Sequence, residues 1–171
     1  LSQNAVDVLT DCPSRERAGW LCDSYFSAKV ELLLSGWNRV EENLLRAYYL
    51  SPQSPYLPEG MVPMCYPADH FDGVYIPTWA MWYILELEDQ YYRSGNRAVV
   101  EASREKVLGI INFFLDNHLN EDGLLEKLES WVMIEWSEAN DYIDGVNYPA
   151  NMLFTRALLA AAALYDRTDL A

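Results

Sequence analysis

The sequence predicts an all-α domain of antiparallel helical hairpins, and three observations lead to that conclusion. Apolar side chains recur at near-helical spacing in five separate stretches. Short turns that contain glycine follow the first and third stretches, where they would end a helix. Long connections separate the pairs that these turns join. Successive hairpins with long loops at one end point to an α/α toroid or a related helical layer.

The first hairpin is predicted over residues 20–50. Residues 20–34 form an amphipathic stretch, and Ser35-Gly36 ends it because glycine adopts the left-handed conformation of a helix C-terminus. Residues 38–50 form the second helix, with a buried stripe made of Val40, Leu44, Leu45 and Tyr48.

The second hairpin follows a long loop. Residues 51–75 hold five of the eight prolines and little periodicity, and long loops on a helical scaffold often carry function. We expect a third helix over residues 76–93, with Pro77 in its first turn. Ser94-Gly95-Asn96 then turns the chain into a fourth helix over residues 98–119.

The last part of the chain combines a stretch without clear periodicity and a helix. Residues 124–145 are mixed, with a possible short strand over residues 131–136. A fifth helix begins at Asn147 or Tyr148 and runs to Tyr165. Because it is apolar nearly all round, we expect an inner helix that is buried on most sides. Residues 1–10 give no assignment.

Composition limits the partners of this chain. Its length of 171 residues fits a single domain, residues 1–171, and 51% apolar residues allow a packed core. The net charge of −14 argues against binding to nucleic acid or to an anionic membrane, whereas a neutral sugar meets no electrostatic objection. Six Trp and twelve Tyr suit either a core or sugar stacking. The apolar run 153–164 is too short and too interrupted to span a membrane.

No cofactor or metal site is predicted. Cys12, Cys22 and Cys65 are odd in number and lack C-x-x-C spacing, so we expect three reduced, inert thiols. Residues 69–72 offer one histidine and two carboxylates in a single loop, which does not specify a metal. His118, near the end of the fourth helix, is expected to cap that helix or lie on the surface. Phosphate-loop, dinucleotide and G-x-S-x-G motifs are absent from the sequence.

Residues 11–23 form the strongest candidate site. This stretch holds three carboxylates, two guanidiniums and an indole, on a predicted loop and first helical turn. A carboxyl group beside an indole and near a second carboxylate is placed to have its pKa raised, which suits Glu16 to act as a general acid. The alternative is a structural turn in which Arg15 and Arg17 neutralise the carboxylates and Trp20 belongs to the core.

A second candidate is the run 135–138 with Asp141 and Asp144. Its indole could stack on a sugar while its carboxylates accept hydroxyl hydrogen bonds. The alternative is an acidic loop anchored by two tryptophans.

The block Asp-Cys-Pro-x-Arg-Glu-Arg-x-Gly-Trp-x-x-Asp at residues 11–23 closely resembles the signature of bacterial α-L-rhamnosidases with an (α/α)6-barrel catalytic domain. Asp72-Gly73, Ile76-Pro77-x-Trp79, Glu135-Trp136 and the run 147–165 resemble later segments of the same family. The likeness therefore covers nearly the whole chain, and the first block is its diagnostic part.

The resemblance implies inverting hydrolysis of terminal α-L-rhamnosides without a catalytic metal or cofactor. By position, Glu16 would be the general acid. Residues that would bind the sugar or support Glu16 are Asp11, Arg15, Trp20 and Asp23. Weaker transfers into the same pocket are Trp79, Glu135 and Trp136.

Two departures from the family bear on function. Leu21-Cys22 stands where many members have Thr-Gly, which changes the pocket wall. The family's barrel has about twice this length, and its general base is a Glu in the second half. We therefore expect an excised piece that holds the acid and lacks the base, unless Glu135 or Glu138 has taken over. Half a toroid also exposes an apolar edge, which the missing half, a partner or a second copy would cover.

Two other functions stay open at this stage. One is a non-catalytic carbohydrate-binding or structural helical module. The other is an enzyme on the same toroid that acts on unsaturated uronides, which would need cations near the pocket, and only Arg15 and Arg17 are nearby. No signal peptide is visible in these residues, so the compartment is open between bacterial cytoplasm and periplasm.

Overall fold

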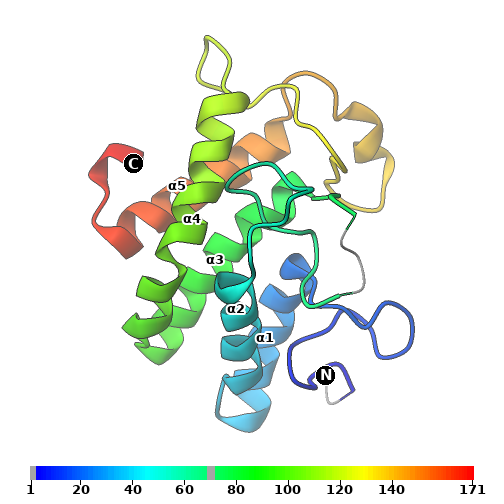
Figure 1. The fold of residues 1–171 in the computed structure, drawn as a ribbon, viewed down its shortest axis with the longest axis vertical. Coiled ribbons are helices and arrows are strands. Elements are labelled where there is room, and N and C mark those ends of the chain that lie inside the picture. Colours follow the sequence, from blue (N-terminus) through cyan, green and yellow to red (C-terminus); the bar gives the residue numbers. More distant parts are fainter. Residues whose placement is uncertain (1–2, 69–71) are drawn as a thin grey trace.

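The computed structural model describes residues 3–68 and 72–171, and within them the fold is all-α, as predicted (Figure 1). Two short 3-10 helices, Glu138–Tyr142 and Thr168–Leu170, accompany five α-helices. The α-helices are α1 (Leu21–Ser35), α2 (Arg39–Leu50), α3 (Pro77–Ser94), α4 (Arg97–Asn117) and α5 (Tyr148–Tyr165). Among these residues no helix is long and apolar enough to cross a bilayer.

The helices begin and end at the residues that the local signals indicate. Gly36 and Gly95 follow α1 and α3 with φ of 74° and 68°, so each closes its helix in the left-handed conformation. Pro77 occupies the first turn of α3. The Asn147 side chain accepts a hydrogen bond from the Ala150 N–H at 3.0 Å and thereby caps α5.

Helix α3 is the inner helix of the structure. It contacts each of the other four α-helices, and most of its side chains are buried. Helix α5 packs on α3, on α4 and on the 3-10 helix Thr168–Leu170, while Met152 and Leu159 on its free face are exposed. Within the described residues α5 is therefore less enclosed than predicted, because an all-round apolar composition does not reveal how many neighbours a helix has.

Two local predictions are corrected by the structure. The expected strand over residues 131–136 is an irregular bend. Its backbone hydrogen bond to another segment runs from Trp131 N–H to the Tyr75 carbonyl at 3.1 Å, and no segment among the described residues extends this contact into a ladder. His118 is not at the surface. Its backbone N–H caps α4, but its ring is buried beside Phe113 and Phe114, at centroid distances of 5.2 and 6.1 Å.

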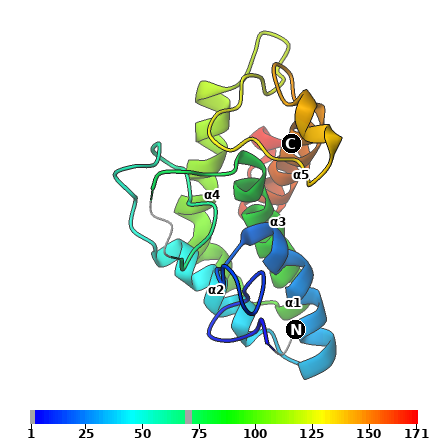
Figure 2. The same cartoon turned by 90° about the vertical axis from the view of Figure 1, so that its right-hand side faces the viewer.

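The long connections gather at one end of the helices. Figures 1 and 2 show the tight turns after α1 and α3 at the lower end, whereas loop 118–147 lies at the upper end and residues 51–68 and 72–76 lie between the two, above α2. Backbone bonds join the segment before α1 to the first of these loops: Tyr66 N–H donates to the Gly19 carbonyl at 3.0 Å and Gly19 N–H to the Pro67 carbonyl at 3.3 Å. Segments distant in the sequence therefore share this end.

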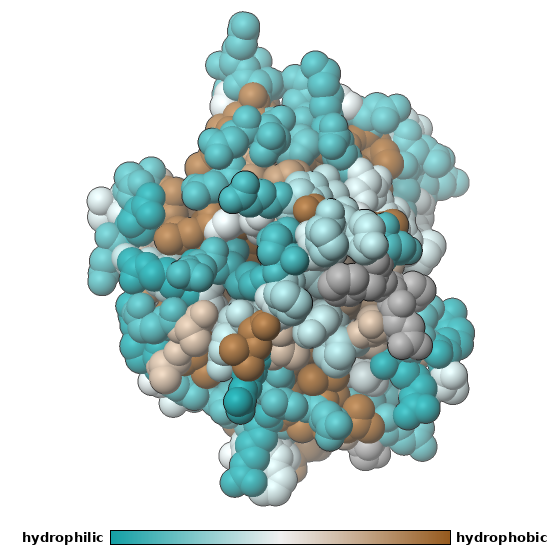
Figure 3. All heavy atoms as spheres, viewed as in Figure 1, coloured by the Kyte–Doolittle hydropathy of each residue, from teal (hydrophilic) through white to brown (hydrophobic). Residues whose placement is uncertain are grey.

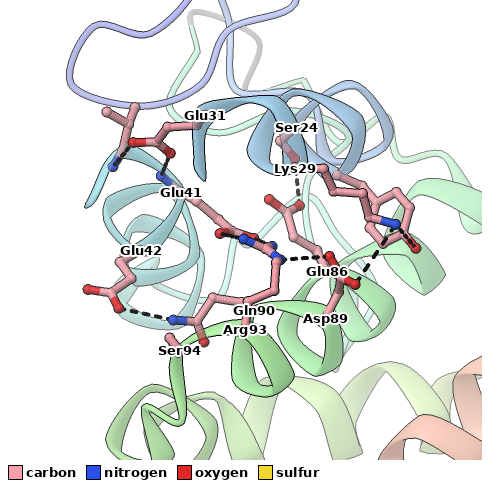
Figure 4. A network of polar contacts seen from close by, with 12 residues as sticks. Ser24, Lys29, Glu31, Glu41, Glu42, Glu86, Asp89, Gln90, Arg93 and Ser94 are labelled. Atoms are coloured by element: carbon pink, nitrogen blue, oxygen red, sulfur yellow. Dashed lines mark hydrogen bonds and ion pairs between the residues drawn. The ribbon is translucent and has the colours of Figure 1, made fainter. Parts of the chain in front are cut away.

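A buried carboxyl group stands where α1 meets α3. Glu86 is fully buried, and Ser24 of α1 donates its hydroxyl to one Glu86 oxygen at 2.6 Å (Figure 4). The other Glu86 oxygen has no hydrogen-bond partner. Burial, with the nearby Glu41 charge adding to it, raises the pKa of Glu86 well above its ordinary value. The fold therefore favours the protonated form of Glu86 over the charged form.

A polar network beside Glu86 ties α2 to α1 and α3 (Figure 4). Arg93 donates two hydrogen bonds to Glu41, at 2.6 and 3.0 Å, and one to Asp89 at 3.0 Å. Burial raises the pKa of Glu41 to about 7, although Arg93 opposes the shift. Glu31 of α1 accepts the backbone N–H groups of Val40 and Glu41 at 3.1 Å each and so caps the start of α2.

Exposed apolar side chains lie along one face of α1, as expected for an unpaired edge. They are Phe26, Val30, Leu33, Leu34 and the following Trp37. Elsewhere, polar residues cover most of the surface seen in Figure 3, and apolar residues form small separate patches. What covers the α1 edge stays a prediction.

Replacing Glu86 by Gln should change how stability depends on pH. As pH rises above about 4.5, the unfolded chain releases a proton that folded Glu86 retains, so the free energy of unfolding falls by about 1.4 kcal/mol per pH unit. Gln mimics the protonated carboxyl group and loses no proton. Urea unfolding should therefore show Glu86→Gln gaining stability over the wild type at pH 8, with little difference at pH 4.5. Glu121→Gln, in an exposed turn, is the control, and equal slopes in all three proteins would contradict the assignment.

Candidate active site

A cleft of about 320 Å³ opens at the loop end of the helices. Four segments form it: the loop before α1, the first turn of α1, the start of α3 and the bend 131–136. Its lining residues are Asp11, Cys12, Arg15, Glu16, Trp20, Asp23, Ile76, Trp79, Trp131, Met133 and Trp136.

Most of the predicted site residues meet in this cleft. The structure brings Asp11, Arg15, Glu16, Trp20 and Asp23 together with Trp79 and Trp136. Glu135 does not line the cleft. Its backbone carbonyl accepts a bond from Asn140, which holds the bend. The sequence did not point to Cys12 as a lining residue, although it lies within the diagnostic block, nor to Ile76, Met133 and Trp131.

The loop before α1 is shaped by its own hydrogen bonds. Asp11 and Ala18 exchange two bonds, one from Asp11 N–H to the Ala18 carbonyl and one from Ala18 N–H to the Asp11 carboxylate, both at 3.1 Å. Arg17 takes a positive φ of 51° within this turn. Gly19 follows, in close contact with Tyr66, and Trp20 is the N-cap residue of α1. These contacts close the loop and keep Asp11 and Glu16 on one side of it.

Asp11 and Glu16 form a coupled pair. Ligand atoms of Asp11, Cys12 and Glu16 lie within 4.8 Å of one another. The hydrogen bond with Asp11, the partial desolvation and the Asp11 charge all raise the pKa of Glu16, against a smaller effect of Arg15. Burial of Asp11 acts to raise its pKa, but hydrogen bonds from Cys12, Glu16 and Ala18 outweigh it and lower the pKa. Of the two carboxyl groups, Glu16 therefore has the raised pKa and Asp11 the lowered one.

The two arginines do not lock the carboxylates. Arg15 approaches Glu16 at 3.6 Å, and both side chains are exposed to solvent, so the pair is weak. Arg17 makes no ion pair within the part of the chain that the structure describes, and it is not among the lining residues. A cavity lies in front of Glu16. The alternative of a structural turn is therefore met only in part: Trp20 does belong to the core, but the arginines do not neutralise the carboxylates.

Aromatic rings form the walls of the cleft. Trp20 and Trp131 meet edge to face at 6.2 Å, and Trp131 meets Trp136 at 6.1 Å. The indole N–H groups of Trp20 and Trp79 are buried and have no hydrogen-bond partner. Flat apolar faces beside carboxylates are the combination that suits sugar rings, because sugars present C–H faces and hydroxyl edges.

The remaining polar groups of the cleft are acidic or neutral. Asp23, on the first turn of α1, keeps solvent access, but the walls of the cleft partly desolvate it and raise its pKa. Cys12, Cys22 and Cys65 are free thiols, and burial raises the pKa of Cys22 and of Cys65 to about 12. Asp11, Cys12 and Glu16 are the three donors that could face a metal ion. The predicted loop 69–72 falls mostly outside the described residues.

A larger groove of about 760 Å³ runs between α4 and residues 53–60. Phe113 is its only aromatic lining residue in the described structure, and it contains none of the predicted site residues. We therefore assign the candidate site to the smaller, aromatic cleft.

Comparison with models of protein families shows which family this chain belongs to. The model of the bacterial alpha-L-rhamnosidase 6 hairpin glycosidase domain matches residues 1–171. The chain belongs to this family. This is the family that the motif at residues 11–23 indicates.

One solved structure shares the fold. The crystal structure of the GH78 family rhamnosidase of Bacillus sp. GL1 superimposes with a TM-score of 0.82 at 23% sequence identity. The match covers 98% of this chain and 17% of that protein, so the chain corresponds to a small part of the longer protein. A search of curated protein sequences gives no match.

Substitution of Asp11 by Asn should lower the pKa of Glu16 toward its ordinary value. Asn removes both the charge and the carboxylate that accepts the Glu16 proton, which are major causes of the upward shift. Carboxyl carbon chemical shifts followed by NMR as a function of pH would measure the change. An unaltered Glu16 titration in Asp11→Asn would show that the two groups are not coupled.

Gly19→Ala should destabilise the loop that carries Glu16. A Cβ at this position would come within 2.3 Å of the Tyr66 carbonyl oxygen, which belongs to the backbone and cannot rotate away. We expect a loss of roughly 1–3 kcal/mol of stability and faster amide exchange at residues 11–20. Gly123→Ala is the control for a destabilising substitution elsewhere in the chain, because it strains a residue with φ of 75° while its Cβ would meet open space. It should leave exchange at residues 11–20 unchanged.

Proposed function

We propose that this domain belongs to an inverting hydrolase of terminal α-L-rhamnosides, in which Glu16 is the general acid. The supporting observation is the Asp11–Glu16 pair that lines the cleft, in which Asp11 raises the pKa of Glu16. A general acid must be protonated before the reaction and must reach the glycosidic oxygen. Glu16 is raised in pKa, faces a cavity and remains accessible to a substrate.

The other cleft residues are proposed to bind the sugar. Trp20, Trp79 and Trp131 offer flat faces for the ring of a 6-deoxy sugar, whose methyl group suits an apolar wall. The indole N–H groups of Trp20 and Trp79 are buried donors without a partner among the described residues. A small movement of either side chain would bring its N–H within hydrogen-bond distance of a sugar hydroxyl. Asp23 and Arg15 add an acceptor and a donor at the rim.

The general base is proposed to come from elsewhere in the complete barrel. Inversion needs a second carboxylate about 6.5–9.5 Å from the acid, so that a water molecule fits between substrate and base. Asp11 is too close to Glu16 and is bound to it. Glu135 and Glu138 do not line the cleft, so neither supports the idea of a replacement base. This chain alone is therefore expected to bind the sugar without turning it over.

Two other candidate functions remain to be separated from this one. A non-catalytic carbohydrate-binding module would bind rhamnose through the same walls and would stay inactive in the complete protein. An enzyme for unsaturated uronides is opposed by the charge of the cleft, where Asp11, Glu16 and Asp23 face a single cation, Arg15.

The test compares Glu16→Gln with wild type in the full-length protein that contains this domain. Hydrolysis of methyl α-L-rhamnoside should fall by about 10²–10⁴-fold, because its leaving group needs the proton. The loss with p-nitrophenyl α-L-rhamnoside should be smaller, since p-nitrophenolate leaves without help. Proton NMR of the first-formed sugar should show the inverted anomer.

Glu138→Gln is the matched control, as Glu138 lies in the neighbouring loop and outside the cleft. Its turnover should equal that of the wild type. Full activity of Glu16→Gln on the methyl rhamnoside would rule out Glu16 as the acid, and rhamnose binding without turnover by the complete protein would favour the binding module.

A further inference from the structure

We infer that Trp136 is the platform for the leaving group of the substrate, and that this leaving group is a neutral ring. The inference rests on the proposed function, because it takes the enclosed part of the cleft as the site of the rhamnose ring. It goes further by assigning the outer part to the group beyond the scissile bond.

The three tryptophans in mutual contact are ordered from floor to mouth. Exposed fractions rise from 9% for Trp20 to 36% for Trp131 and 82% for Trp136. Each ring contacts the next, at 6.2 and 6.1 Å between centroids. A sugar that rests against Trp20 and Trp79 would therefore direct its leaving group toward solvent, where Trp136 presents its open face.

The fold does not require an indole at position 136. The bend is held by polar bonds: Ile134 N–H donates to the Asn140 side chain at 2.8 Å, and Ala139 N–H donates to the Ser137 hydroxyl at 3.1 Å. Thr78 of α3 donates its hydroxyl to the Met133 carbonyl at 2.7 Å and anchors the bend from below. A large apolar side chain that stays in water and supports no core contact is available for a ligand.

The charge around Trp136 selects a neutral ring. Glu135, Glu138, Asp141 and Asp144 surround it in the sequence, and no Lys or Arg occurs between Lys127 and Arg156. Arg15 is a cation that lines the same cleft, but Asp11, Glu16 and Asp23 line it too, so acidic groups outnumber it there. A carboxylated leaving group would be repelled by this loop, especially at low salt. A neutral hexose face or a neutral aromatic ring can stack on the indole without that cost.

The test measures binding to the full-length protein that contains this domain by calorimetry, with sulfur-linked analogues that resist hydrolysis. The ligands are L-rhamnose, p-nitrophenyl 1-thio-α-L-rhamnoside, and thio-linked rhamnosyl-glucose and rhamnosyl-glucuronate. The wild type should bind the aryl or the glucose conjugate about tenfold more tightly than rhamnose. Trp136→Ala should remove most of that ratio, and Trp136→Phe should keep most of it.

The arms of the test distinguish the two sources of a ring. If Trp136→Ala lowers the affinity ratio of conjugate to rhamnose only for the aryl conjugate, the leaving group is aromatic. If it lowers the ratio only for rhamnosyl-glucose, the leaving group is a sugar. Rhamnosyl-glucuronate should bind more weakly than rhamnosyl-glucose at low salt. Trp37→Ala, an exposed tryptophan beyond the opposite end of α1, is the control and should leave every ratio unchanged.

Two results would overturn the inference, and they differ in whether the proposed function survives. If rhamnose binds and the ratios survive in Trp136→Ala, the platform is wrong while the proposed function stands. If the wild type binds none of the four ligands, the proposed function fails and the inference fails with it.

Discussion

The burial of α3 against the four other helices is the constraint on which the rest of the structure depends. Its middle is packed by large apolar side chains, and its lower half carries Glu86 and Arg93 into contact with α1 and α2. Its first turn, by contrast, supplies Trp79 to the cleft and Thr78 to the bend that bears Trp131 and Trp136. One rigid element thus fixes both the helical layer and one wall of the site.

The opposite wall depends on a loop whose polar residues 11–17 lie between the buried side chains Leu9 and Ala18. The segment before α1 is closed by the paired bonds between Asp11 and Ala18 and is held down where Gly19 touches Tyr66. The same Asp11 carboxylate then raises the pKa of Glu16. A single side chain therefore links the shape of the loop to the protonation of the proposed acid, which explains why these residue types occur so close together in the sequence.

The polar groups of the molecule fall into two sets with different roles. Around Glu41 and Glu86, carboxyl groups are buried between helices and serve the packing, with protonation or Arg93 offsetting the cost of burial. In the cleft, the carboxyl groups of Asp11, Glu16 and Asp23 face a cavity with only one cation beside them. Asp11 also closes the loop through Ala18, whereas Glu16 has only a weak, exposed ion pair with Arg15, so carboxyl groups gathered in this cleft with raised pKa values mark a candidate ligand site.

The sequence by itself determined the helices, their ends and the diagnostic block, because these depend on near neighbours. Gly36, Gly95 and Pro77 act through their own backbone geometry, and the spacing of apolar residues reflects the helical period. Only the tertiary structure decided that α3 and not α5 is innermost, that residues 131–136 bend instead of forming a strand, and that Trp131 faces the cleft while Glu135 does not. These outcomes depend on which distant segments lie alongside, and no local pattern records the number or the direction of such neighbours.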